Sequence, residues 1–121
     1  MKEIRKSQRR VQNIHTAEFS PWTSGDGTVS GESVLQLNDN PKAVGFHVYK
    51  MQPGTYSQPH EHTGDEEFLV LSGELIDNDG TVYREGDLIW LEKGTQHYSY
   101  TKTGCVLAVY IDTAEKNINS N

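Results

Sequence analysis

The sequence predicts an all-β fold, a sandwich or a barrel, from two observations. Short runs of strand-forming residues recur along the chain at fairly regular spacing, with little helical periodicity between them. Glycines separate these runs, at positions 45, 54, 64, 73, 80, 86, 94 and 104, where tight turns with positive φ are expected. A chain of 121 residues suits one domain with one core.

The individual strands are predicted from alternation and from β-branched and aromatic content. The expected strands cover residues 33–37, 43–51, 67–71, 73–77, 81–84, 88–91, 97–101 and 105–111. The tripeptide Asn78-Asp79-Gly80 predicts a hairpin turn between two of them. Residues 17–30 are rich in turn formers, and Phe19 and Trp22 are the expected anchors of that stretch.

Charge divides the chain into a basic arm and an acidic body. Residues 1–16 contain five basic residues and one acidic residue, which gives this segment a net charge of +4. Because the whole chain has a net charge of −6, the remaining residues carry a net charge of −10. We expect an arm over 1–16, a β-barrel over 17–113 and a frayed tail over 114–121. The arm either packs on its own acidic surface or on a second subunit, or binds a nucleic acid or another acidic partner.

Composition also narrows the functional classes. The net charge of −6 argues against a general nucleic-acid binder. No stretch approaches the ~20 apolar residues of a membrane span, and no signal-peptide core follows the basic start. The single cysteine, Cys105, can form neither an internal disulfide nor a cysteine-rich zinc site, so the expected compartment is the cytoplasm.

Residues 60–67 read HEHTGDEE and precede a predicted strand. Side chains alternate along a strand, so His60 and His62 share one face and can reach one cation. A carboxylate from residues 65–67 would complete a mixed nitrogen and oxygen site, suited to Fe, Mn, Zn, Ni or Cu. Alternation through the following strand puts Glu66, Phe68 and Val70 on one face and Glu67, Leu69 and Leu71 on the other.

A short HxH pair can arise by chance, and acidic turns are often simply solvated. A distant third histidine strengthens the metal interpretation. His97 follows a predicted strand and the turn Lys93-Gly94.

These residues resemble the first motif of the cupins, G-x5-HxH-x3,4-E-x6-G. Gly54 precedes TYSQP, His60 and His62 form the pair, Glu66 follows TGD, and Gly73 follows six residues later. Every fixed position of that motif is filled.

The second cupin motif, G-x5-P-x-G-x2-H-x3-N, is matched in part. Gly86, Gly94 and His97 occupy their positions, while Glu92 replaces the proline and Thr101 replaces the asparagine. Neither replaced position is a metal ligand in the family, so the resemblance to the metal site is intact. The missing proline makes the turn before Gly94 less rigid.

The stretch PGTYSQPHEHTGDEEFLVLSGELIDNDG, His97 and Gly104-Cys105 resemble the ChrR-like cupins more closely. The resemblance extends over about residues 30–111, and only about thirty residues precede it. The N-terminal helical domain of the ChrR-type anti-sigma proteins is therefore expected to be missing, and an anti-sigma role is not implied. The resemblance implies a stand-alone double-stranded β-helix, or jelly-roll barrel, with one divalent transition metal held by His60, His62, Glu66 and His97. The remaining carboxylates of the first motif, Glu61, Asp65 and Glu67, are then expected to be solvated.

The resemblance further implies a mononuclear metal-dependent oxidoreductase of the dioxygenase type, acting on a small diketone, organic acid or phenolic substrate. The alternatives are a non-catalytic sensor that binds a metal or a small ligand, and an empty structural barrel. We expect a homodimer, because exposed edge strands need cover.

Five other residues also carry expectations. Ser99 and Thr101 share the face of His97, where their hydroxyls either serve the pocket or only pack. His47 shares a face with Tyr49, but a lone strand histidine is more often structural. Cys105 is expected to be a small buried hydrophobe, and Trp90 to lie in the core or in a dimer interface.

Overall fold

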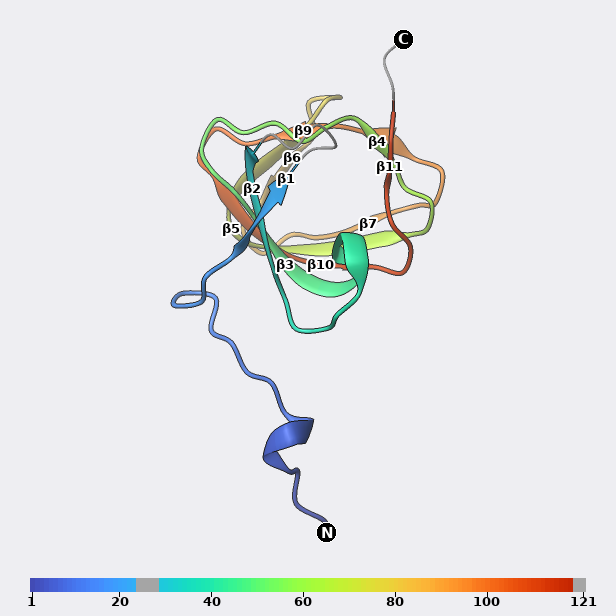
Figure 1. The fold of residues 1–121 in the computed structure, drawn as a ribbon. Coiled ribbons are helices and arrows are strands. Elements are labelled where there is room, and N and C mark those ends of the chain that lie inside the picture. The colour runs from blue at the N-terminus through green and yellow to red at the C-terminus, as the bar shows by residue number, and fades with distance from the viewer. Residues whose placement is uncertain (24–28, 119–121) are drawn as a thin grey trace.

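A computed structural model of the protein describes residues 1–23 and 29–118, and antiparallel strands dominate it (Figure 1). Its strands are β1 (Ser20–Thr23), β2 (Val29–Gln36), β3 (Gly45–Met51), β4 (His60–Glu61), β5 (Glu66–Asp77), β6 (Val82–Arg84), β7 (Leu88–Leu91), β8 (Gln96–His97), β9 (Ser99–Tyr100), β10 (Cys105–Ile111) and β11 (Lys116–Asn117). Two short 3-10 helices, η1 (Lys6–Gln8) and η2 (Pro41–Ala43), accompany them.

The strands form two sheets that wrap around a common interior (Figure 1). The larger sheet has the order β1-β2-β3-β10-β5-β6, and β7 and β9 also pair with β5. The smaller sheet has the order β11-β4-β8. Every strand pair in both sheets is antiparallel, so the all-β prediction is confirmed.

The core follows from the two-residue period of the strands. Along the first half of β5, Glu66, Phe68 and Val70 are buried while Glu67 and Leu69 are exposed, as alternation predicts. Burial raises the pKa of the Cys105 thiol to about 11, so this cysteine is an inert core residue at neutral pH. The buried hydrophobic cluster consists of Met51, Phe68, Val70, Leu75, Cys105, Leu107, Val109 and Ile111.

Two strand predictions need correction. Residues 67–71 and 73–77 form one strand, because Gly73 adopts a φ of 77° and stays paired with Cys105 instead of ending the strand. The predicted strand over 97–101 is divided at Tyr98 into β8 and β9, since β8 pairs with β4 and β9 pairs with β5. β1 lies in the stretch expected to hold only turns, and residues 24–28 of that stretch lie outside the described residues.

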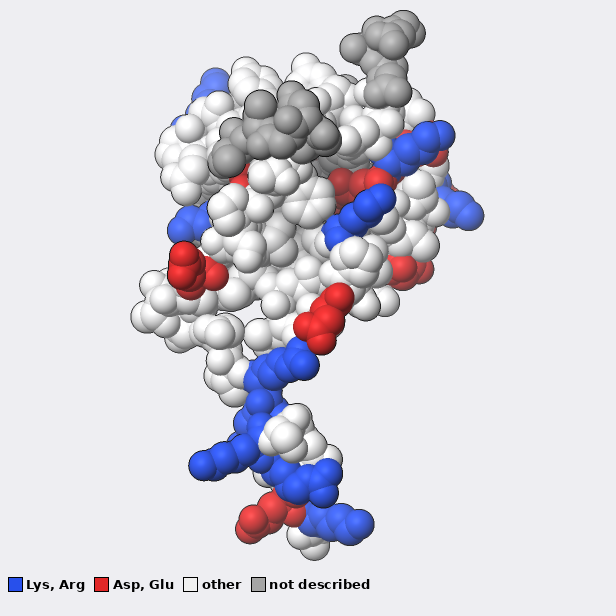
Figure 2. Space-filling view, viewed as in Figure 1, with Lys and Arg blue, Asp and Glu red and all other residues white. Residues whose placement is uncertain are grey.

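The basic arm runs away from the barrel (Figures 1 and 2). Its contact with the body is made by Arg10, whose Nη1 donates to the Leu37 carbonyl at 2.5 Å and whose Nη2 lies 3.6 Å from Asp39. Lys2, Arg5 and the neighbouring basic residues are exposed, so the arm does not cover its own acidic surface.

The tail prediction is wrong for its first half. Lys116–Asn117 forms β11 and pairs with β4, so the chain stays ordered well past residue 114. Residues 119–121 lie outside the described part of the chain. Within the described residues, no helix has the length and apolar character needed to cross a membrane.

Candidate metal centre

Three histidines converge at one wall of the barrel interior. Strand pairing places His97 of β8 directly opposite His60 of β4, and His62 follows β4 with its side chain on the same face. Each of the three rings offers a nitrogen, and these ligand atoms all lie within 4.8 Å of one another. The predicted cluster of His60, His62 and His97 is therefore assembled as the sequence indicated.

Hydrogen bonds fix the proton of each ring on the nitrogen that faces away from the cluster. His60 Nδ1 lies 2.7 Å from the Gln58 carbonyl, which can only accept, so this nitrogen carries the proton. His97 Nδ1 lies 2.9 Å from Oδ1 of Asp77, which also accepts. In the neutral rings, both Nε2 atoms consequently point inward with free lone pairs.

His62 also carries its ring proton on Nδ1, which follows from a chain of two hydrogen bonds. The Thr95 hydroxyl donates its one proton to the Glu92 carbonyl at 2.7 Å, so it must accept from His62 Nδ1, at 2.9 Å. The Nε2 atom of His62 is buried and has no hydrogen-bond partner. Burial and the neighbouring rings of His97 and His60 lower the pKa of His62 to about 4, so the ring is neutral at pH 7.

An isolated cluster of this kind is unfavourable. His97 Nε2 and His60 Nε2 lie 3.0 Å apart, although each nitrogen presents a lone pair to the other. A buried polar atom without a partner costs free energy, on the order of 1–3 kcal/mol. A cation among the three nitrogens would satisfy all of them, so the donor set fits a divalent transition metal.

Glu66, the first residue of β5, lies beside this cluster. Its Oε1 atom is 3.5 Å from His62 Nε2, and its side chain is 9% exposed. Burial raises the pKa of Glu66 well above its usual value, and the charge and hydrogen bond of Glu115 add to that shift. A bound cation would favour the ionised carboxylate instead.

Asp77, which sequence reasoning missed as a site residue, supports the cluster from behind. It accepts hydrogen bonds from the Tyr83 hydroxyl at 2.5 Å, the Ser99 hydroxyl at 2.5 Å and His97 Nδ1 at 2.9 Å. Burial alone would raise the pKa of Asp77, but these hydrogen bonds lower it below its usual value. A stable carboxylate at this place orients His97 and increases the basicity of its Nε2.

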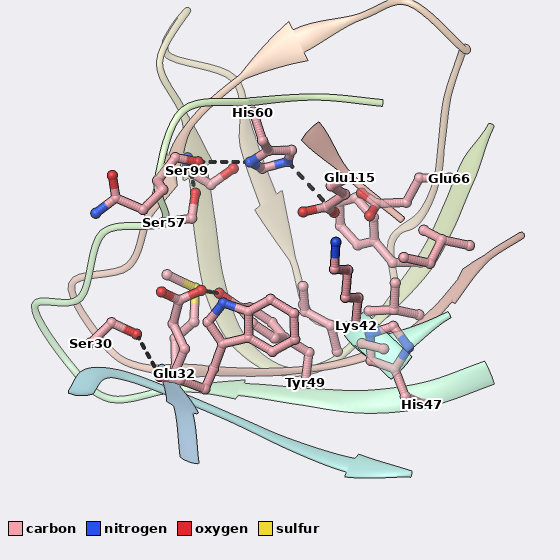
Figure 3. Close-up of a pocket in the computed structure, with 18 of the residues that line it drawn as sticks. Ser30, Glu32, Lys42, His47, Tyr49, Ser57, His60, Glu66, Ser99 and Glu115 are labelled. Carbon is pink, nitrogen blue, oxygen red and sulfur yellow. Dashed lines mark hydrogen bonds and ion pairs between the residues drawn. The ribbon is translucent and has the colours of Figure 1, made fainter. Parts of the chain in front are cut away.

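A cavity of about 170 Å³ adjoins the cluster (Figure 3). His60, Glu66 and Glu115 lie at one side of it, and Glu32 and Tyr49 lie across from them. The Tyr49 hydroxyl donates to Glu32, and both burial and that carboxylate raise the tyrosine pKa. Apolar walls are supplied by Trp22, Met51, Phe68, Leu75, Leu107, Val109 and Ile111.

His47 also lines this cavity, although a structural role seemed the commoner outcome. Its side chain is buried, and burial lowers its pKa despite the hydrogen bond with the Gly45 carbonyl. Ser99 faces the cavity as well, whereas Thr101 donates to the Glu74 carbonyl at 2.6 Å and only packs.

The carboxylates expected to be solvated do lie away from the cluster. Glu61 accepts from the Gln96 amide at 2.8 Å, Asp65 accepts from the Lys93 backbone at 2.8 Å, and Glu67 is exposed on the outer face. Trp90 is 55% exposed on the outer surface, so it does not lie in the core, and its alternative place in a dimer interface stays a prediction.

An antiparallel barrel with a metal-capable histidine cluster inside it is the architecture of a cupin. The family model of the ChrR cupin-like domain matches residues 7–114, and the chain belongs to this family. The resemblance drawn from the two histidine motifs is thereby confirmed. A comparison with curated protein sequences finds no match.

Solved structures support the fold. The polyketide cyclase RemF from Streptomyces resistomycificus aligns with a TM-score of 0.70 at 18% identity, over 93% of this chain and 87% of its own. An acetylacetone dioxygenase from Acinetobacter johnsonii aligns with a TM-score of 0.73 at 13% identity, over 100% and 87%. At these identities the likeness shows the cupin β-barrel alone.

The anti-sigma protein ChrR of Rhodobacter sphaeroides, solved in complex with SigE, is a further structural neighbour. It aligns with a TM-score of 0.62 at 19% identity, over 80% of this chain and 49% of the other. The chain therefore corresponds to about half of ChrR.

Proposed function

We propose that this cupin is a mononuclear metal-dependent oxidoreductase of the dioxygenase type, acting on a small diketone, organic acid or phenolic substrate. The observation that carries the proposal is the buried, unpartnered Nε2 of His62, facing the inward nitrogens of His60 and His97 beside a cavity. We assign His60, His62, Glu66 and His97 as metal ligands. A redox-active ion held there would supply the binding and polarisation of O₂ or of substrate oxygens.

The cavity favours a small substrate with one polar end. Its volume of about 170 Å³ is below the roughly 300–1,000 Å³ of pockets for drug-sized ligands. Trp22 and Phe68 offer apolar surface, while the histidine wall offers the polar end of the site. A compact diketone or a small phenolic matches this division between an apolar body and chelating oxygens.

Lys42 is the residue best placed to bind a negatively charged substrate oxygen. It lines the cavity, its side chain points inward toward Glu115 (Figure 3), and it forms no ion pair with any described residue. Lys42 and Ala43 both have left-handed backbones, with φ of 57° and 60°, at a cost of roughly 1–2 kcal/mol per residue. Strain of this kind gathers at functional sites, and Gln36 holds the loop through the Val44 carbonyl at 2.8 Å.

The test is oxygen consumption by protein reconstituted with Fe(II). We expect O₂ uptake with at least one member of a panel of diketones, thiols and catechols, and none from a His62→Ala variant treated in the same way. Absence of uptake with the entire panel would contradict the dioxygenase assignment. In that case, ligand binding without turnover would favour the sensor alternative, which the exposed basic arm also supports.

We also propose that the protein is a homodimer that pairs through the outer face of its larger sheet. Tyr110 of β10 pairs with Phe46 of β3 and with Glu67 of β5, and Leu69 of β5 pairs with Leu88 of β7. Strand alternation points these side chains outward, which creates an exposed apolar patch of a kind that is rare on monomers. The outer-face patch consists of Phe46, Leu69, Leu88, Trp90 and Tyr110, each at least 36% exposed.

The expected occupant of the outer-face patch is a second copy of the chain. The arm carries +4 and extends away from its own barrel, while the rest of the chain carries −10, so an arm attracts the body of another copy. Light scattering should give the mass of two chains, and the double variant Leu88→Glu, Trp90→Glu should give the mass of one. Tyr56→Glu, at a residue 60% exposed outside the patch, should stay dimeric. A monomeric wild type would refute the dimer.

A further inference from the structure

The C-terminal tail is fastened to the metal-centre wall at two points. On one side, β11 pairs with β4, and the Ile118 amide donates to the Pro59 carbonyl at 3.0 Å. On the other side, the Thr63 hydroxyl donates to the Ala114 carbonyl at 2.7 Å. Glu115 is the residue between these two fastenings, so its backbone position is set by both.

Gly64, within the first histidine motif, leaves room for the two residues that lead into the tail. A Cβ atom at residue 64 would lie 2.3 Å from Asp112 Oδ1 and 2.7 Å from Thr113 Oγ1. Such contacts are too short for a real Cβ atom, so this close packing depends on the missing side chain of Gly64. Residues 112 and 113, directly before the tail, therefore lie against the same turn that separates His62 from Glu66.

The tail brings the Glu115 carboxylate into the histidine cluster. Figure 3 shows Glu115 pointing toward His60, beside Glu66. Its Oε1 lies 3.7 Å from His60 Nε2, and its side chain is 33% exposed. The ligand atoms of Glu115, Glu66 and His62 all lie within 4.8 Å of one another.

Glu66 and Glu115 share a hydrogen bond, but this contact needs a proton between the two carboxylates. Two carboxylates at contact distance repel each other unless a proton or a cation lies between them. When the His60 ring is neutral, its Nε2 atom has a lone pair to offer and nothing to donate to Glu115. The Nε2 atom of His62, in a side chain only 1% exposed, faces the same space without a hydrogen-bond partner.

We propose that Glu115 is a fifth ligand of the metal centre, delivered by the C-terminal tail. The inference rests on the proposed metal site of His60, His62, Glu66 and His97 and adds to it a carboxylate from outside both histidine motifs. Two carboxylates balance the charge of a divalent ion, so the centre is neutral when the tail is docked. Metal binding and ordering of the tail are then coupled, since each stabilises the other.

Cobalt(II) titration tests the inference, because the visible absorption of the bound ion reports its ligands. We expect Glu115→Gln to bind Co(II) at least about 10-fold more weakly than wild type, with an altered absorption spectrum. Glu61→Gln is the matched control: it lies on β4, bonds to Gln96, and should leave both affinity and spectrum unchanged. A Glu115→Gln variant with wild-type affinity and spectrum would overturn the inference. That result is expected if Glu115 forms only an ion pair with protonated His60 and does not bind the metal.

Hydrogen exchange on the same proteins gives an independent check. Addition of Co(II) should slow exchange of the Ile118 amide in wild type and have little effect on it in Glu115→Gln. Equal protection in both proteins would show that the tail docks without a bond from Glu115 to the ion. A wild type that bound no Co(II) at all would instead overturn the proposed metal centre itself.

Discussion

Purified protein should contain about one equivalent of a transition metal per chain, and His62→Ala should contain almost none. The change at His62 should have the largest effect, because its Nε2 is the one buried side-chain nitrogen or oxygen atom without a hydrogen-bond partner among the described residues. Loss of a direct ligand should weaken metal binding by more than the roughly 10–100-fold caused by changes to residues behind the ligands. Elemental analysis of tag-free protein measures the result.

His15→Ala is the control for this experiment. His15 lies exposed in the N-terminal arm, far along the chain from the cluster, so its loss should leave the metal content unchanged. Iron, manganese, nickel or copper in wild type would support redox chemistry, while zinc would favour Lewis-acid catalysis or a sensor function. Wild type that is isolated without metal and does not take up added metal would contradict the whole assignment.

The sequence predicted the histidine cluster by two routes, because the two cupin motifs mark all of its members and strand alternation accounts for His60, His62 and Glu66. His60 and His62 are two residues apart, Glu66 opens a strand whose alternation is unambiguous, and His97 follows a recognisable strand and turn. The outward orientation of Glu61 and Glu67 follows from the same two-residue period. Local pattern and final fold agree at all of these positions.

Residues that join the site through long-range pairing could not be recognised in this way. Glu115 lies in a polar tail whose strand is two residues long and exists only because β4 offers it an edge. Asp77 looks like the first residue of the turn DNDG, and nothing local shows that it also faces His97, twenty residues later. Lys42 reaches the cavity through a left-handed backbone that its own residue type disfavours.

The continuity of strand β5 explains why Asp77 was missed as a site residue. Its first half carries Glu66 and pairs with β7, and its second half carries Asp77 and pairs with β6 and β9. A break at Gly73 would have put Glu66, which lies beside the histidine cluster, and Asp77, which hydrogen-bonds His97, on separate strands. Because the strand continues, one element positions Glu66 at the cluster and Asp77 behind it, 11 residues apart in the same strand.

Asp77→Asn is expected to weaken metal binding by roughly 10–100-fold and to destabilise the metal-free fold by about 3 kcal/mol. The amide keeps the shape of the carboxylate, but it loses the charge that holds His97 and replaces one acceptor with a donor facing Tyr83 or Ser99. Metal titration and urea unfolding measure the two effects. Asp39→Asn is the control, because the Asp39 side chain is 89% exposed and its change should cost little.

The pH dependence of the unfolding free energy separates charge from shape in this comparison. Because the folded pKa of Asp77 lies below its unfolded value, the carboxylate stabilises the fold at neutral pH and loses that contribution as the pH falls through the folded pKa. Asparagine does not titrate, so the gap between metal-free wild type and Asp77→Asn should narrow as the pH is lowered from about 5 toward 3. A gap that stayed constant over this range would mean that Asp77 acts through packing alone, and the charge would not be what orients His97.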